Sequence, residues 1–343
     1  MTGETGAGAA PAGPAGTGDA VNRRRAVLLM GPTGSGKSEL ALHLAEALPL
    51  EIVSVDSALV YRGMDIGTAK PSAAVRAQVP HHLIDIRDAA ESYSAGEFTR
   101  DAWHAMQDIW RRGRQPLLVG GTMLYFHALS HGIAQLPAAD PELRAEIERE
   151  AASLGWAALH RELVRVDPDA AARIHVNDPQ RIQRALEVHR LTGATITELQ
   201  LRRMSVFADI DVAEFVVAPL ERSDLHTRIK VRFGAMLDAG LLSEVRTLYE
   251  RSDLGAEHPS MRAVGYRQLW RHLAGQCALD EAENQAIAAT RQLAKRQLTW
   301  LRKRESAMWF DSMHPEIARM MIDALLKRGF ASSSGITPQG ALC

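Results

Sequence analysis

The sequence predicts an α/β fold: a parallel sheet of the P-loop type, flanked by helices, with a helical insertion domain. A glycine-rich loop, GPTGSGKS at 31–38, separates the apolar run RRRAVLLM from the amphipathic run SELALHLAEAL. Strand and helix patterns then alternate to about residue 132, which is typical of a parallel sheet covered on both faces. From about residue 138 to 205 the patterns are almost entirely helical. An insertion within one α/β domain explains this order better than two domains in series.

The expected elements follow from short β-branched runs and the helical patterns between them. After the first strand we expect helices between strands, two long helical stretches in the insertion (PELRAEIEREAASLGWAALHRELVRV and DAAARIHVNDPQRIQRALEVHRLTG), and helices only from 221 to about 330. The expected strands are RRRAVLLM (23–30), EIVSVDS (51–57), LIDI (83–86), QPLLVGGT (115–122) and FVVAPL (215–220). The expected divisions are a disordered tail (1–22), the core (23–132 and 206–330), the insertion (133–205) and a loose tail (331–343).

Composition excludes several classes of protein. The chain has 343 residues and a formal net charge of −1, so a nucleic-acid partner would have to meet local basic patches. Cys277 and Cys343 form no CxxC pair, which argues against a zinc module or a disulfide framework and suits a reducing cytoplasm. No segment approaches the roughly 18 apolar residues that a membrane span needs.

The loop at 31–38 fits the pattern of nucleotide-binding, ATP-binding P-loops, G-x-x-x-x-G-K-[ST]. Its glycines let successive backbone N–H groups converge on an anion, and Lys37 adds a positive charge. The Ser38 hydroxyl can reach a magnesium ion. The loop therefore predicts phosphate binding, but it does not say which compound carries the phosphate.

Two polar residues follow expected strands at the edge where open α/β sheets bind ligands. Asp56 ends one strand, and we weigh a magnesium ligand or a helix N-cap against a general base. Thr122 follows a pair of glycines, and its hydroxyl could bind a phosphate or the attacking group. The alternative for Thr122 is an ordinary N-cap of the next helix.

Two basic stretches are candidates for a phosphate backbone, although most such arcs are merely solvated. In NDPQRIQRALEV, Asn177 or Asp178 caps a helix that Pro179 begins, and Gln and Arg together can read base edges. In RQLAKRQLTWLRKR (291–304), Ala294, Leu298 and Leu301 form an apolar stripe. The neighbouring basic arc there consists of Arg291, Lys295, Arg296, Arg302 and Lys303.

The motifs together resemble the tRNA isopentenyltransferase family, the bacterial tRNA dimethylallyltransferases, over roughly residues 25 to 310. They are GPTGSGKS, VDSALVYRGMDIGTAKP, HHLIDI, YSAGEF, LVGGTMLYFHAL, RIHVNDPQRIQRALEV, RAVGYRQLW and AKRQLTWLR, in that order. The resemblance implies transfer of the dimethylallyl group of dimethylallyl diphosphate to N6 of the adenosine 3′ to the tRNA anticodon. It also implies that the loop holds a prenyl diphosphate and that no nucleoside triphosphate is hydrolysed.

The resemblance also implies site roles. Asp56 would be the catalytic base, Thr122 would lie near the reacting centre, and Mg²⁺ would bind at Ser38. Gly34 and Ser38 stand where alanine and threonine are common in relatives, without loss of the needed chemistry. The diphosphate set is Gly31, Pro32, Thr33, Gly34, Ser35, Gly36, Lys37, Ser38 and Arg232, with Arg228 as an alternative to Arg232. The tRNA set is Asp56, Ser57, Ala58, Leu59, Arg144, Gln180, Arg181, Ile182, Gln183, Arg184, Arg262, Gly265, Tyr266, Arg267, Lys295, Arg296, Gln297, Trp300 and Arg302.

The resemblance thus gives the partners as dimethylallyl diphosphate and the tRNA anticodon stem-loop, which the insertion would close over. No membrane partner is expected, and we expect a cytoplasmic monomer. Two other classes remain open on the residues alone. A P-loop small-molecule kinase would not need the basic arc. An RNA-binding P-loop ATPase would need an acid and a water-orienting residue after an apolar strand, and QPLLVGGT ends with neither.

Overall fold

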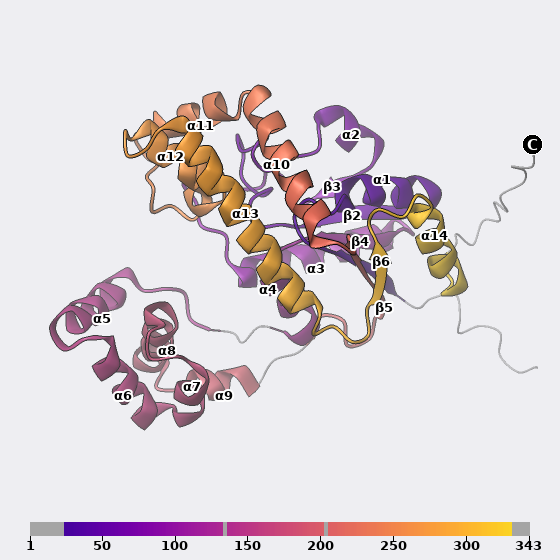
Figure 1. Ribbon diagram of the computed structural model, residues 1–343. Helices are drawn as coiled ribbons and strands as arrows, with labels where there is room; N and C mark the ends of the chain where they lie inside the picture. The colour runs from indigo at the N-terminus through magenta and orange to yellow at the C-terminus, as the bar shows by residue number, and fades with distance from the viewer. Residues whose placement is uncertain (1–23, 133–135, 202–204, 331–343) are drawn as a thin grey trace, which may run out of the picture.

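A computed structural model of the protein describes residues 24–132, 136–201 and 205–330 (Figure 1). It confirms the α/β class: six strands form one parallel sheet in the order β3-β2-β4-β1-β5-β6. The strands are β1 (Arg25–Met30), β2 (Leu50–Val55), β3 (His81–His82), β4 (Gln115–Gly120), β5 (Asp211–Ala218) and β6 (Met308–Asp311).

The central strand β1 is almost continuously apolar because both of its faces are covered. Leu28 and Met30 belong to one hydrophobic core, whereas Val27 and Leu29 belong to the other. This alternation follows from the two-residue period of a strand, which sends successive side chains to opposite faces. The sheet is therefore the middle of three layers.

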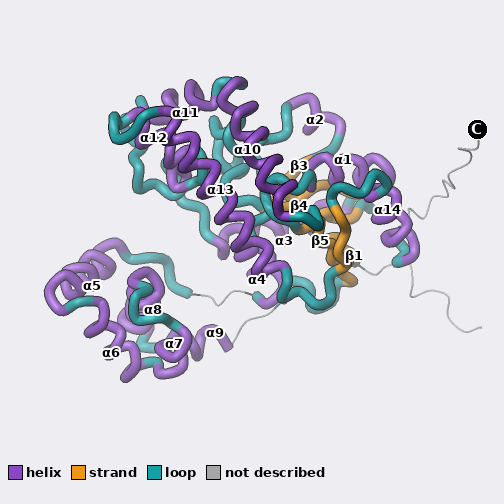
Figure 2. Tube along the Cα trace, viewed as in Figure 1, coloured by secondary structure: helices purple, strands orange, loops and turns teal. Residues whose placement is uncertain are grey.

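Helices cover both faces of the sheet (Figure 2). One core is closed by α1 (Lys37–Ala47) and α14 (Ile317–Lys327), which contact each other. The opposite core is closed by α3 (Ala95–Arg111), α4 (Met123–His131), α10 (Arg222–Asp238), α11 (Leu241–Tyr249), α12 (Tyr266–Leu273) and α13 (Leu279–Leu301). Two short elements, α2 (Ala73–Gln78) and η1 (Ser260–Arg262), lie in the connections.

Residues 136–201 form a separate helical body beside the sheet domain (Figure 1). Its own core includes Ile147, Leu159, Leu163 and Leu186. The chain leaves the sheet domain after α4 and returns before β5, and Val206 N donates a hydrogen bond to Leu129 O at 2.9 Å. The helices are α5 (Pro141–Leu154), α6 (Trp156–Val166), α7 (Pro168–Arg173), α8 (Pro179–Thr192) and α9 (Ile196–Leu201).

The start of α8 follows the expected capping chemistry. Pro179 occupies the first turn, and Asp178 is the N-cap, accepting a hydrogen bond from Arg181 N at 3.2 Å. Asn177 is not the cap. Further along α8, the fully buried Glu187 accepts hydrogen bonds from Arg144 Nε at 2.8 Å and from Arg184 NH1 at 2.6 Å. The bond from Arg144 joins α5 to α8, whereas the bond from Arg184 lies within α8.

The expected strand LIDI at 83–86 is wrong. The strand is the preceding pair His81–His82, and Leu83 and Asp85 have left-handed backbones, with φ of 64° and 57°. A strand requires φ near −120°. The turn is held by tertiary contacts, because the Asp85 carboxylate accepts hydrogen bonds from Lys70 Nζ at 2.5 Å and Arg76 NH1 at 2.8 Å.

The expectation of helices only after residue 220 is also wrong, because β6 completes the sheet at its edge. This strand has only four residues, and its first two are exposed, so its pattern is too short to stand out in the sequence. Its pairing depends on a distant partner: the Phe310 ring packs edge-to-face on Phe215 of β5, with centroids 5.3 Å apart.

Within the described ranges, every helix is too short or too polar to cross a membrane. The two expected tails, 1–22 and 331–343, lie outside the described residues. So do residues 133–135 and 202–204, which lie at the two ends of the expected insertion (133–205).

Candidate active site

Two adjacent cavities open at the carboxyl edge of the sheet. Cavity 1, about 540 Å³, lies beside the first turns of α1, and cavity 2, about 450 Å³, lies beside α4 and α13. The two cavities share walls that include Asp56 and Arg232. A reaction between ligands bound in the two cavities would therefore take place beside this carboxylate and this guanidinium.

The phosphate loop forms the polar end of cavity 1. Gly34 and Gly36 have φ of 82° and 87°, a left-handed backbone that glycine adopts without steric cost. The loop turns so that α1 begins at Lys37, with its N-terminus toward the cavity. Lining residues from the loop are Thr33, Gly34, Gly36, Lys37 and Ser38; Gly31, Pro32 and Ser35 support it from outside the cavity wall.

Lys37 carries the charge that an anion in cavity 1 would meet. Its ammonium donates a hydrogen bond to Pro32 O at 2.8 Å. Burial lowers the pKa of Lys37 to about 7; the Asp56 carboxylate acts in the opposite direction, and Arg232 lowers the pKa further. Near neutral pH this amine therefore exchanges its proton readily, and a bound anion would favour the charged form.

Asp56 lies between the cavities and is partly fixed by the backbone. One carboxylate oxygen accepts hydrogen bonds from Ala58 N at 2.8 Å and Leu59 N at 3.4 Å. The other oxygen has no hydrogen-bond partner within the described ranges. Asp56 caps a turn and does not begin a helix, so it is not the helix N-cap that was one alternative. Its second oxygen remains available for other chemistry.

Arg232 of α10 is the arginine that enters the site. It lines both cavities, whereas Arg228 lines neither and donates to Met313 Sδ at 3.4 Å. Burial lowers the pKa of Arg232, and the Asp56 carboxylate opposes that effect. An arginine keeps its proton in proteins, so Arg232 supplies a fixed positive charge next to Asp56.

Thr122 lies in the wall of cavity 2 and not of cavity 1. It occupies the N-cap position of α4, but its hydroxyl forms no capping bond. Instead, Ser57 N donates to Thr122 Oγ1 at 3.0 Å, which ties the turn after β2 to the turn after β4. The expected N-cap bond is therefore absent from this hydroxyl.

The Gln297 side chain joins the loops that separate the cavities. Thr33 N donates to Gln297 Oε1 at 2.9 Å, and Gln297 Nε2 donates to Gly121 O at 2.7 Å. A Cβ at Gly121 would lie 2.5 Å from Gln297 Nε2, and a Cβ at Gly120 would lie 2.0 Å from Val55 O. Both positions of LVGGT therefore require glycine. A side chain would collide with Gln297 at Gly121 and with the backbone of β2 at Gly120.

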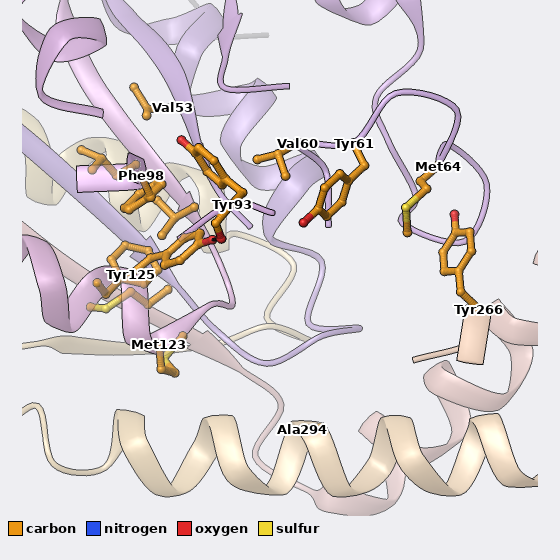
Figure 3. Packing of buried hydrophobic residues seen from close by; sticks show 14 of the residues in the cluster. Val53, Val60, Tyr61, Met64, Tyr93, Phe98, Met123, Tyr125, Tyr266 and Ala294 are labelled. Carbon is orange, nitrogen blue, oxygen red and sulfur yellow. Dashed lines mark hydrogen bonds between the residues drawn. The ribbon is translucent and has the colours of Figure 1, made fainter. Parts of the chain in front are cut away.

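A carboxylate holds the loop at 65–67, which lines both cavities. Glu244 of α11 accepts hydrogen bonds from Asp65 N at 2.8 Å, Ile66 N at 2.7 Å and Gly67 N at 3.2 Å. The Tyr266 hydroxyl donates to the same carboxylate at 2.5 Å. Figure 3 shows the Tyr266 ring beside Met64 at this contact.

Three residues of the expected tRNA set are buried, although two of them, Tyr266 and Gln297, line cavity 2. Ile182 lies in the core of the helical body, Tyr266 in the core of the sheet domain, and Gln297 between two loops. Gly265 is also buried; it has a φ of 94° and begins α12. The side chains of Ile182, Tyr266 and Gln297 already make internal contacts, and a contact of these residues with tRNA stays a prediction.

The other expected tRNA residues of the helical body divide into two kinds. Gln180 and Arg181 are exposed on the first turn of α8. Arg144 and Arg184 are bound to Glu187, and Gln183 Nε2 donates to Arg144 O at 3.2 Å and to Glu148 at 3.0 Å. The second group can still present unused N–H groups, but its primary partners are internal.

The basic arc differs from its expected form. Ala294 and Leu301 are buried as expected, but α13 ends at Leu301, so Arg302 and Lys303 lie in the turn that follows. Arg291 is partly buried, and its Nε has no hydrogen-bond partner among the described residues. Besides Asp56, the exposed or partly exposed members of the tRNA set that line the cavities are Ser57, Ala58, Leu59, Arg296 and Trp300. Further members are exposed but line neither cavity: Arg262, Arg267, Lys295 and Arg302.

Sequence reasoning missed Ser54 and Glu244. Ser54 lines cavity 1 and is 4% exposed, and its hydroxyl has no hydrogen-bond partner in the described part of the chain. Its signal was available, since a serine between valines, two residues before Asp56, points to the same face of the strand as Asp56. Glu244 had no comparable signal, because its partners are 177 to 179 residues away.

The oxygen donors of cavity 1 fit a magnesium ion only with help from a bound phosphate. Across the described ranges, no group of three or more His, Cys, Asp and Glu side chains could hold a metal ion. Ser38 and Asp56 line the cavity together. Mg²⁺ usually binds through one or two protein oxygens, substrate phosphates and water, which this pair could satisfy.

Sequence comparisons give one family. The family model described as IPP transferase matches residues 59–304. A tRNA dimethylallyltransferase of Nitrosococcus oceani is 60% identical over 289 residues, which covers 84% of this chain and 92% of that protein.

Structural comparisons agree with the sequence comparisons. The full-length tRNA isopentenylpyrophosphate transferase of Bacillus halodurans is 37% identical, with a TM-score of 0.66 over 90% of this chain and 97% of that chain. A eukaryotic dimethylallyltransferase acting on tRNA is 25% identical, with a TM-score of 0.77 over 92% of this chain and 81% of that chain. Neither the small-molecule kinase nor the RNA-binding ATPase is favoured by these likenesses.

The hydrogen bonds of Gln297 predict a structural effect of its removal. Gln297→Ala leaves Thr33 N and Gly121 O without partners, which should cost about 1–3 kcal/mol of stability. Binding of inorganic diphosphate should weaken, because the phosphate loop loses its tie. Calorimetry and thermal unfolding measure both effects. Normal stability and normal diphosphate affinity in this variant would show that these hydrogen bonds do not hold the phosphate loop.

The lowered pKa of Lys37 predicts pH-dependent anion binding. The free amine loses its proton above about pH 7, and an anion binds the protonated form. Affinity for inorganic diphosphate should therefore fall by up to about tenfold per pH unit as pH rises from 7 toward 9. Lys37→Arg should remove this fall, because arginine stays charged. An equal fall in wild type and variant would assign the dependence to another group.

Proposed function

The chain belongs to the IPP transferase family and transfers a dimethylallyl group to tRNA, and we propose how its two cavities divide this reaction. Dimethylallyl diphosphate occupies cavity 1, and the acceptor, N6 of the adenosine 3′ to the anticodon, enters through cavity 2. The observation that carries the proposal is the shared wall, in which Asp56 and Arg232 face both cavities.

The positive groups of cavity 1 suit the negatively charged donor. The N-terminus of α1, the backbone N–H groups of the phosphate loop and Lys37 form an anion site. Apolar residues farther inside, including Ile52, Ile84 and Val119, provide surroundings suited to the prenyl group. The same loop in an ATPase would need an acid to position water, and QPLLVGGT supplies none.

The residues at the opening of cavity 2 suit the acceptor. Trp300 is 46% exposed and lines this cavity together with Arg296 and Thr122. An exposed aromatic ring next to a cation suits an unstacked nucleobase and its phosphate. The target adenosine must leave its stack to reach Asp56, as in other enzymes that modify bases.

The chemistry is one substitution at carbon. The N6 lone pair forms a bond to C1 of the dimethylallyl group while the bond from C1 to the diphosphate oxygen breaks, and that electron pair leaves with the diphosphate. Asp56 accepts the proton that N6 gives up. Lys37 and Arg232 stabilise the negative charge that grows on the leaving group.

Mg²⁺ is proposed to bind beside Ser38 and Asp56 when the diphosphate is present. When bound, it would neutralise part of the charge on the leaving group. The chain itself orients the diphosphate and holds the base. We further propose that the protein acts in the cytoplasm, where its acceptor tRNA is found, and that it acts as a monomer.

One assay tests the proposed donor. Labelled dimethylallyl diphosphate and unmodified tRNA should give labelled tRNA and free diphosphate in equal amounts. Labelled ATP, incubated in the same way, should remain intact. Hydrolysis of ATP without transfer of the prenyl label would overturn the assignment of the phosphate loop to the donor.

Asp56→Asn tests the proposed base. Single-turnover prenyl transfer should slow about a hundredfold or more, the scale of a lost general base. Donor and tRNA affinities should remain near wild type, because asparagine has nearly the same shape and can accept the same hydrogen bonds from Ala58 and Leu59. Wild-type rates in this variant would return Asp56 to a structural role in its turn.

A further inference from the structure

An open groove of about 420 Å³ lies between α12 and α13, outside the two cavities. Its polar lining consists of arginine and glutamine side chains and contains no carboxylate. Arg267 and Arg271 come from α12, and Gln285 and Gln292 come from α13. Of these residues, only Arg267 belongs to the tRNA contacts expected from the sequence.

The positive charge of the groove is not neutralised by the protein. Arg267 is exposed and forms no side-chain hydrogen bond or ion pair with the described residues. Arg271 donates only to neutral amides, to Gln285 Oε1 at 3.1 Å and to Gln276 Oε1 at 3.3 Å. The nearby Glu281 carboxylate accepts from Gln285 Nε2 at 2.9 Å and does not line the groove.

The two arginines also oppose each other. They are four residues apart on one helix, which places them on the same face, and like charges at this spacing destabilise a helix. By contrast, Arg190 of α8 is bound to two acidic partners, Glu150 and Glu162. An anion in the groove would relieve the repulsion between Arg267 and Arg271.

The groove continues toward the mouth of cavity 2. Residues Gln285, Ala289, Gln292 and Arg296 recur at helical spacing and share one face of α13. Arg296 lines cavity 2, so this face leads from the groove to the proposed entrance of the adenosine. Eleven residues of helix rise about 16 Å, the length of about five nucleotides in a stacked strand.

We propose that this groove binds the sugar-phosphate backbone of the anticodon loop beside the target adenosine. The inference rests on the proposed function, since it places the RNA strand relative to cavity 2. Arginine and glutamine N–H groups are typical donors to phosphate oxygens, and such contacts position a strand without reading its sequence. Arg271, Gln285 and Gln292 are thereby added to the tRNA-binding residues.

The test compares the salt dependence of binding to an unmodified anticodon stem-loop, measured by fluorescence anisotropy. Arg271→Gln should reduce the slope of log K against log salt by about 0.7–0.9, the value for one lost phosphate contact. Arg271→Lys should keep the slope, because it keeps the charge. Gln292→Glu, at an exposed side chain without internal hydrogen bonds, should weaken binding about two- to fivefold at low salt.

Arg319→Gln on α14 is the matched control. It removes the same charge from an exposed arginine on the opposite face of the sheet, and it should leave the slope unchanged. Donor KM at saturating tRNA should be unchanged in all variants, which shows that they are folded.

Wild-type slopes and affinities in Arg271→Gln and Gln292→Glu would show that the groove does not bind the RNA backbone. An equal loss of slope in Arg319→Gln would contradict the proposal as well. Prenylation of the stem-loop by the wild-type protein is read separately. Absence of that product would overturn the proposed function itself. A normal product, together with variants whose salt slope and affinity equal those of the wild type, would overturn only the proposed RNA binding in the groove.

Discussion

The arrangement of the site depends on the Gln297 amide, which bonds at once to the phosphate loop and to the turn after β4. These segments are far apart in sequence, and the sheet brings them together where Met30 of β1 pairs with Gly120 of β4. Beyond these strand ends, the Gln297 side chain joins the two segments. Because Gln297 belongs to α13, the same contact ties that helix to the carboxyl edge, where the phosphate loop and the shared wall of the cavities lie.

A second constraint is electrostatic. Lys37 and Arg232 are both buried in part around Asp56, and burial disfavours each positive charge. One carboxylate cannot neutralise two cations, so positive charge is in excess around Asp56 whenever Lys37 is protonated. Such a site is suited to a ligand that brings several negative charges, because that ligand replaces water with fixed, oppositely charged groups.

The sheet core could be predicted because its signals are local. The loop at 31–38 and the glycine pair at 120–121 mark the ligand-binding edge by backbone requirements alone. The errors arose where distant residues decide the outcome. Asp85 has a left-handed backbone held by Lys70 and Arg76, and β6 is a strand only beside β5. Likewise, Gln297 and Tyr266 stand within motifs of the expected tRNA surface, but their side chains point inward to Gly121 and Glu244.

The hydrogen bond between Val206 and Leu129 brings together the two points at which the chain leaves and re-enters the sheet domain. Everything between these points is one contiguous stretch of chain with its own hydrophobic core. Such a stretch can be exchanged by a single recombination event without altering strand order, as is common for domains inserted where chain ends lie close together. Evolution could in this way replace the helical body while the carboxyl edge of the sheet, with its two cavities, is inherited intact.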